Sequence, residues 1–195
     1  MTQYARPDAD SSNPGGWAQS TGITLYGVID EDDDSDNSDY VSVNDMIGSM
    51  LSFEVELAPV TDPESDLLHE FSIRAKAAIV PNDITVTILL KQGASTIASK
   101  TVTTLTTSVA TFTHSLSEAE AAAITDYSDL RLHITHQDAG MSMTDTEVHQ
   151  AYFECGNVPT SDDKPPQTFN LVPGGELGTS FSLDIDESMF SLMGL

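Results

Sequence analysis

Apolar and polar residues alternate along most of the middle of the chain, and this period-two pattern constrains the fold more than any other feature. In Ser52–Ala58, SFEVELA, the residues Phe53, Val55 and Leu57 alternate with polar ones. Six further stretches behave in the same way: EFSIRAKAAIV, DITVTILLKQ, STIASKTVTTL, SVATFTHSL, DLRLHITHQ and TEVHQAYFEC. Because successive strand side chains point to opposite faces, these stretches predict half-buried β-strands.

Turn-forming segments separate these stretches, namely APVTDPES, VPNDI, KQGAS and QDAGMS. We expect one more strand in LYGVID, Leu25–Asp30. About seven or eight short strands joined by such turns predict an all-β fold, an antiparallel jelly-roll-like β-sandwich.

One segment breaks the alternation and predicts a short helix. In SLSEAEAAAITDYSDL, Ser117 is followed three residues later by Glu120, which is the spacing of a capping box, and an alanine run comes next. We therefore expect one short helix at residues 118–125, between two strands.

The two ends of the chain differ from its middle. Residues 1–20 have two prolines, two glycines and few apolar side chains, so we expect an extended N-terminal arm before a sandwich domain at 21–156. Residues 157–195 begin with proline-rich sequence typical of an extended linker. The chain then becomes apolar again, which predicts a C-terminal docking segment with these partner-binding residues: Phe181, Leu183, Ile185, Met189, Phe190, Leu192, Met193 and Leu195.

The charge of the chain excludes several functions. Thirty-one acidic residues against seven basic ones give a formal net charge of −24. Nucleic-acid affinity comes largely from Lys and Arg, so we expect no nucleic-acid partner. We also expect no membrane span, because no apolar run reaches the roughly 20 residues that a transmembrane helix requires.

The most acidic stretch, Ile29–Tyr40, reads IDEDDDSDNSDY, and three interpretations of it stay open. An EF-hand that starts at Asp32 would need glycine at its sixth position and glutamate at its twelfth, where the chain has Asn37 and Val43. The composition favours a solvated loop, with another kind of calcium site or a nucleic-acid mimic as alternatives.

No catalytic or metal-binding motif is recognisable, so we expect no enzyme activity and no cofactor. The histidines show neither HxxxH nor HExxH spacing, and no GxSxG marks a nucleophile. His133 and His149 fall in separate predicted strands, which favours scattered histidines over a zinc site. Cys155 ends a predicted strand and is interpreted as an inert core or edge residue.

Two groups of residues have both a structural and a binding interpretation. Arg74, Lys76 and Arg131 lie at polar strand positions, where pairing with carboxylates is favoured over a contact face for a partner. Trp17 and Tyr26 either anchor the N-terminal arm, which is favoured, or form a platform on which a sugar ring stacks.

The order of several phrases resembles a family, the small β-sandwich virion structural proteins of tailed viruses of bacteria and archaea. These phrases are ARPDAD, GGW, LYGVIDE, DDSDNSDYV, SFEVELAPVTDPESDLLHEFSIRAKA, ITVTILLKQGASTIAS, LSEAEAAAITDYSDLRLHIT and VHQAYFEC, within residues 5–155. Arg74 matches the basic position of the family pattern, and Asp126 and Tyr127 match its DY.

This resemblance implies a non-enzymatic virion structural protein, located in the virion. We expect it on the capsid surface, as a decoration or a vertex or turret component. Its partners would be the major capsid protein or neighbouring copies in a homo-oligomer, bound through the terminal arms. The alternatives are a tail-associated structural protein and a carbohydrate-binding module used in host attachment, with a glycan as the ligand.

Overall fold

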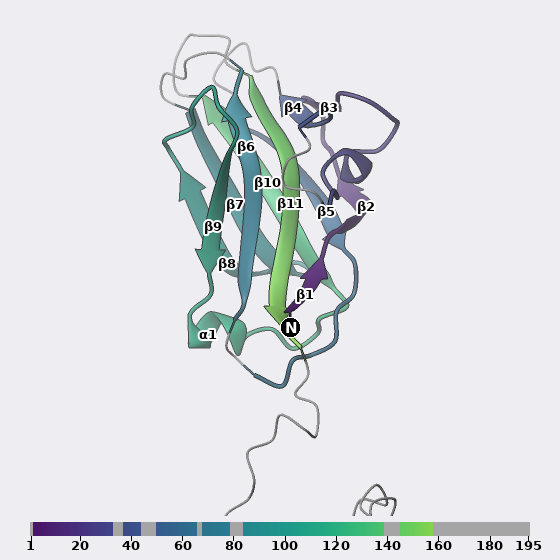
Figure 1. Cartoon of the computed structure of the whole chain (residues 1–195), viewed down its shortest axis with the longest axis vertical. Coiled ribbons are helices and arrows are strands. Elements are labelled where there is room, and N and C mark those ends of the chain that lie inside the picture. Colours follow the sequence, from purple (N-terminus) through teal and green to yellow (C-terminus); the bar gives the residue numbers. More distant parts are fainter. Residues whose placement is uncertain are drawn as a thin grey trace, which may run out of the picture. The chain divides into compact units, whose positions relative to one another are not determined.

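The computed structural model describes residues 2–32, 37–43, 50–65, 68–78, 84–138 and 145–157. Two antiparallel sheets pack face to face (Figure 1). The protein is therefore an all-β, jelly-roll-like β-sandwich with a short α-helix, as the alternation predicts. None of the helices in these ranges is long and apolar enough to cross a membrane.

Each sheet combines strands from distant parts of the chain. The six-stranded sheet has the order β3 (Trp17–Gln19), β4 (Val41–Val43), β11 (Thr146–Gly156), β6 (Glu70–Ala77) and β9 (Ala110–Ser115), and β1 (Thr2–Ala5) also pairs with β11. The five-stranded sheet has the order β2 (Pro7–Ser12), β5 (Met50–Leu57), β10 (Leu130–Asp138), β7 (Ile84–Gln92) and β8 (Ser95–Val102).

The core lies between the sheets and is built by the apolar half of each alternating pattern. Phe53 of β5 faces it from one sheet, and Phe71 of β6 and Phe153 of β11 face it from the other, each at most 1% exposed. Burying such a side chain contributes about 1.5–3 kcal/mol. The polar residues between them therefore form the two outer faces of the sandwich, where a binding site can lie.

The seven alternating stretches of the sequence analysis form β5 to β11, so these predictions are confirmed. The predicted strand at Leu25–Asp30 is wrong, because this segment contains a 3₁₀ helix, η1 (Tyr26–Val28). Leu25, Val28 and Ile29 are buried, and their spacing of three and four residues is helical. The Asp10 carboxylate also accepts hydrogen bonds from the Leu25 and Tyr26 amides, which fixes the turn.

The predicted helix exists, but it is shorter than expected. Helix α1 covers Glu118–Ala121, and Ser117 and Glu120 form the predicted capping box. The helix ends after about one turn instead of near residue 125. Ile124 and Tyr127 are both buried, so the chain turns back onto the core at once.

The N-terminal residues do not form an arm separate from the sandwich, in contrast to the expectation for residues 1–20. They contain β1 and β3 of one sheet and β2 of the other. Main-chain pairing with β11 and β5 compensates for their low apolar content. One compact unit, residues 1–161, contains all of the described strands. The predicted docking residues from Phe181 to Leu195 lie outside the described part of the chain.

Candidate functional site

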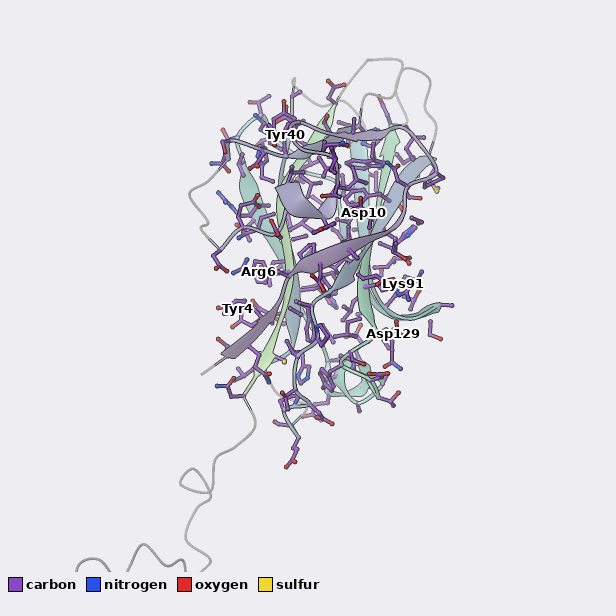
Figure 2. All side chains as sticks on the ribbon, turned by 90° about the vertical axis from the view of Figure 1, so that its right-hand side faces the viewer. Tyr4, Arg6, Asp10, Tyr40, Lys91 and Asp129 are labelled. Atoms are coloured by element: carbon purple, nitrogen blue, oxygen red, sulfur yellow. The ribbon has the colours of Figure 1, made fainter. Side chains whose placement is uncertain are left out.

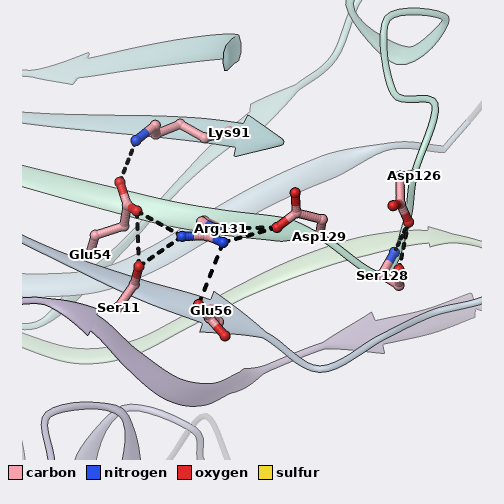
Figure 3. A network of polar contacts seen from close by, with 8 residues as sticks. All are labelled: Ser11, Glu54, Glu56, Lys91, Asp126, Ser128, Asp129 and Arg131. Carbon is pink, nitrogen blue, oxygen red and sulfur yellow. Dashed lines mark hydrogen bonds and ion pairs between the residues drawn. The ribbon is translucent and has the colours of Figure 1, made fainter. Parts of the chain in front are cut away.

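The outer face of the five-stranded sheet carries a network of charged side chains, shown in Figure 3. Glu54 of β5 lies at its centre and is only 7% exposed. Its carboxylate accepts hydrogen bonds from Lys91 of β7 and from Ser11 of β2. Arg131 and His133 of β10 approach the same carboxylate at 3.6 and 3.3 Å. Three strands, β2, β7 and β10, thus bring polar side chains to one buried acid on β5.

Arg131 extends this network to two further acids. Its guanidinium lies 3.1 Å from Asp129 and 3.5 Å from Glu56, and it also donates a hydrogen bond to Ser11. The hydrogen bond to Asp129 is the main reason why the pKa of Arg131 is raised. The charges of the network largely balance one another, so the network ties β2, β5, β7 and β10 together and offers little net charge to a ligand.

The pKa of Glu54 reports this balance. Burial alone would raise the pKa of this carboxyl, but the hydrogen bond and charge of Lys91, with Ser11 and His133, lower it below 4.5. Glu54 is therefore ionised at neutral pH and holds its cationic neighbours.

The basic residues singled out in the sequence have mainly structural contacts. Arg131 pairs with the acids above, and Lys76 lies 3.0 Å from Glu147, so the favoured interpretation is confirmed for both. Arg74 donates a hydrogen bond to the Asn37 side chain at 3.1 Å.

The other outer face carries a different group of residues, which we call the tyrosine patch: Tyr4, Arg6 and Tyr152. The rings of Tyr4 in β1 and Tyr152 in β11 meet edge to face, with centroids 5.7 Å apart. The Arg6 guanidinium carbon lies 5.5 Å from the first ring centroid and 5.8 Å from the second. Figure 2 shows Tyr4 and Arg6 along the same edge of the sandwich. Tyr4 is 48% exposed, so an aromatic ring remains accessible to a ligand.

Arg6 is held in place from its other side. It donates a hydrogen bond to the Glu31 carbonyl, and its Nε lies 2.6 Å from the Asp32 carboxylate. Gln150 of β11 donates to the same carbonyl at 2.7 Å. The start of the acidic stretch therefore fixes the cation that lies against both rings.

A row of side chains crosses the sheet from this patch. Tyr152 is opposite Ser72 of β6, and Ser72 is opposite Thr113 of β9. The Ser72 and Thr113 hydroxyls lie 2.7 Å apart. With strands about 4.8 Å apart, a row over β1, β11, β6 and β9 spans about 14 Å. Ser72 is fully buried, so the row offers a ligand the aromatic surface at one end and the exposed Thr113 hydroxyl at the other. Sugar binding needs both ring stacking and hydrogen bonding.

The tyrosine patch was not among the residues predicted from the sequence to bind a ligand. Its signal is present in the pattern, because Tyr152 occupies a polar, outward position between the buried Ala151 and Phe153. Tyr4 lies in a segment that was expected to be an arm, and only the pairing of β1 with β11 brings the two rings together.

Trp17 does not form a sugar platform, since it is 4% exposed and packs against Phe53 with ring centroids 4.7 Å apart. The favoured interpretation, anchoring of the N-terminal segment, is confirmed for Trp17. Cys155 is fully buried, and this burial raises its pKa to about 11, so its thiol is inert in the folded protein.

The histidines are scattered over both sheets. His133 contacts Glu54 in the five-stranded sheet, whereas His149 is a buried residue of β11 in the other. Burial is the largest reason why the pKa of His149 is lowered. Within the described ranges, no group of three or more His, Cys, Asp or Glu residues has the geometry to hold a metal ion. Residues 33–36 of the acidic stretch lie outside these ranges, so its calcium interpretation remains a prediction.

Comparison with known proteins gives no family: no family model and no curated protein matches the chain. Among solved structures, the chain is similar to TmCBM61 in complex with β-1,4-galactotriose, with 7% identity, a TM-score of 0.38, and 78% of this chain and 86% of that chain covered. It is similar to CBM29_1, a family 29 carbohydrate binding module from Piromyces equi, with 8% identity, a TM-score of 0.39, and coverages of 84% and 95%.

The Stig cyclase Fisc from Fischerella sp. TAU is also similar, with 11% identity, a TM-score of 0.42, and coverages of 80% and 90%. These likenesses concern the fold alone. They assign neither a ligand nor a reaction to this chain.

Proposed function

We propose that this protein is a non-catalytic glycan-binding module, and that the tyrosine patch is the centre of its binding surface. The observation that carries this proposal is the half-exposed ring of Tyr4, held against Tyr152 and Arg6 at one end of a polar row. Sugar rings have apolar faces that pack on aromatic rings, and their hydroxyls bind to fixed polar groups.

The geometry of the patch is preorganised, which favours binding. Arg6 is fixed by Asp32 and the Glu31 carbonyl, and Tyr152 belongs to a central strand. Little side-chain freedom is therefore lost when a ligand binds, and this reduces the entropic cost of association. Two strand spacings separate Tyr152 from Thr113, about 10 Å, which is comparable to the length of a disaccharide.

A glycan array with the purified full chain tests this proposal. We expect binding to a subset of neutral glycans, with affinity reduced at least tenfold by Tyr4→Ala. Tyr26→Ala is the matched control, because Tyr26 is a partly buried tyrosine outside the patch. Absence of binding to every glycan, or equal loss in the two variants, contradicts the proposal.

A second candidate function is that of a virion structural protein that assembles with neighbouring subunits. It is the function implied by the family resemblance, and one structural observation favours it. Strand β9 is an edge of the six-stranded sheet, because within the described residues it pairs with β6 alone. An open strand edge is a surface to which another chain can add a strand.

Quantitative mass spectrometry of purified particles from the source tests the second candidate. Tens of copies for each particle would support a capsid-surface role, and a few copies a tail or vertex role. Absence of the protein from particles contradicts both positions. A glycan-binding module on a virion surface would satisfy both candidate functions, so the two experiments are independent.

A further inference from the structure

Strand β9 offers an open edge of main-chain groups. The Leu116 amide donates to the His69 carbonyl, and the β6–β9 register continues this pairing to His114 and Phe112. In an antiparallel pair the main-chain groups alternate in direction along the strand. The N–H and C=O groups of Thr111, Thr113 and Ser115 therefore point away from β6, to the open side.

This edge has none of the protections that strand edges usually carry. Its outward side chains are hydroxyls, and β9 contains neither proline nor Lys, Arg, Asp or Glu. Its pairing with β6 runs without a register shift from Ala110 to Ser115. Sheet edges without charges, prolines or bulges are prone to pair with further strands.

The other described sheet edges are protected or short. At the β8 edge, Lys100 is opposite the core residue Ile88 and so lies on the inner side, and a register shift occurs beside Leu90. Strand β2 begins with Pro7 and has two register shifts against β5. Strands β1 and β3 have four and three residues. Among the described strands, β9 is thus the acceptor best suited to strand addition.

The chain itself contains a sequence that fits this edge. In Ser180–Asp186, SFSLDID, the residues Phe181, Leu183 and Ile185 alternate with polar ones, which is the pattern of a half-buried strand. The side chains on the inner side of β9 are only partly buried, and one of them, Phe112, packs against the core. An added strand would extend this apolar surface on its inner side and keep its polar residues outside.

We propose that residues 181–186 of a second copy add to the open edge of β9 as an antiparallel strand. A second copy is the proposed source because the second candidate function is the assembly of neighbouring copies, and each copy carries both the β9 edge and residues 181–186. The linker is long enough for residues 181–186 to reach β9 of another copy, since the 22 positions 158–179 can extend over about 70 Å.

Charge selects the orientation. The outer face of β6 has Arg74 opposite Thr111 and Glu70 opposite Ser115. Consider an antiparallel strand with Asp184 opposite Thr113. Its Asp186 then lies opposite Thr111, at the end of β9 next to Arg74. Its Ser182 lies opposite Ser115, at the end next to Glu70. The opposite orientation would bring the acidic residues to Glu70, which is unfavourable because like charges repel.

This pairing rests on the second candidate function, a virion structural protein, and adds the surface and the segment through which its copies would join. The pairing uses the main-chain groups of β9, whereas the tyrosine patch lies at β1 and β11, and the two surfaces share only Thr113. The experiment uses purified full-length protein without particles. If no strand pairing is found, mass spectrometry of particles still tests separately whether the protein is part of the virion.

The test mixes two variants of the full chain that each gain one cysteine, Thr113→Cys and Asp184→Cys, in oxidising buffer with 1 M salt to screen the net charge. Opposite residues of a hydrogen-bonded antiparallel pair have Cα atoms about 5.5 Å apart, a distance that a disulfide can bridge. A disulfide between the two variants can form only between copies. Cys155 does not compete, because it is fully buried and its pKa is about 11.

We expect a covalent heterodimer to form. Its rate of formation should be at least ten times higher than in a control mixture of Thr113→Cys with Leu183→Cys, because the side chain at position 183 would point to the other face of the sheet. Equal rates, or no link, overturn the proposal.

As a second measurement, light scattering should find that wild type and Thr113→Ala associate, whereas Thr113→Pro is monomeric. This proline removes an outward N–H and leaves the pairing with β6 intact. A monomeric wild type also overturns the proposal.

Discussion

Replacing Glu54 with glutamine should destabilise the sandwich far more than the same change at Glu56. Glu54 is 7% exposed and contacts Lys91, Arg131 and Ser11, whereas the Glu56 side chain is 47% exposed. Removing one partner of a buried ion pair costs about 3–5 kcal/mol, because the other charge stays buried. Each change removes one negative charge, so the effect of net charge is matched.

The expected cost at Glu54 is below that range for two structural reasons. The side chains of Lys91 and Arg131 are 18% and 26% exposed, and Arg131 keeps Asp129 and Glu56 as partners. We therefore expect Glu54→Gln to cost about 2 kcal/mol of unfolding free energy, against about 0.5 kcal/mol for the exposed pair of Glu56. For a domain of this size, 2 kcal/mol lowers Tm by about 4–8 °C.

Urea unfolding followed by far-ultraviolet circular dichroism measures both variants. The pH dependence supplies a second check, because the pKa of Glu54 is lower in the folded than in the unfolded protein. Its contribution is present above the unfolded pKa of about 4.5 and is lost as pH falls through the folded pKa. The difference between wild type and Glu54→Gln should thus shrink from pH 7 to pH 3. Equal losses for the two variants, or a difference independent of pH, would refute the reasoning.

Three further predictions concern local structure. Ser117→Ala removes the capping box with Glu120 and should cost about 1 kcal/mol of unfolding free energy in urea titrations; an unchanged midpoint would argue against the cap. Gly93→Ala should lower Tm by several degrees, because Gly93 has φ +53° and an added Cβ would lie 2.9 Å from Asp129 Oδ2; an unchanged Tm would contradict this strain. Burial, opposed by a main-chain hydrogen bond and assisted by neighbouring acids, raises the pKa of Glu31 to about 7. The folded protein holds the Glu31 proton more tightly than the unfolded chain, so the stability contributed by this proton is fully present below pH 4.5 and is lost as pH rises through 7. Glutamine stays neutral, so Glu31→Gln should raise Tm at pH 8 and change it little at pH 4; the reverse pattern in thermal melts would contradict this prediction.

The local predictions that failed have a common cause. At Leu25–Asp30 the apolar content suggested a strand, but the carboxylate of the distant Asp10 holds the segment as a 3₁₀ helix. Residues 1–20 lack apolar content, yet β11 and β5 supply main-chain partners for β1 and β2. In both cases the deciding contact joins residues far apart in the sequence, which a local pattern does not contain.

The sequence by itself determined the strands β5 to β11, the capped helix α1 and the all-β class, because side-chain alternation and capping depend on neighbouring residues. Only the tertiary structure decided which strands are neighbours. Strand order brings Tyr4 onto Tyr152, gathers the partners of Glu54 from three other strands and leaves β9 at an open edge. These three features carry the binding, stability and assembly arguments, and each results from pairing between segments that are distant along the chain.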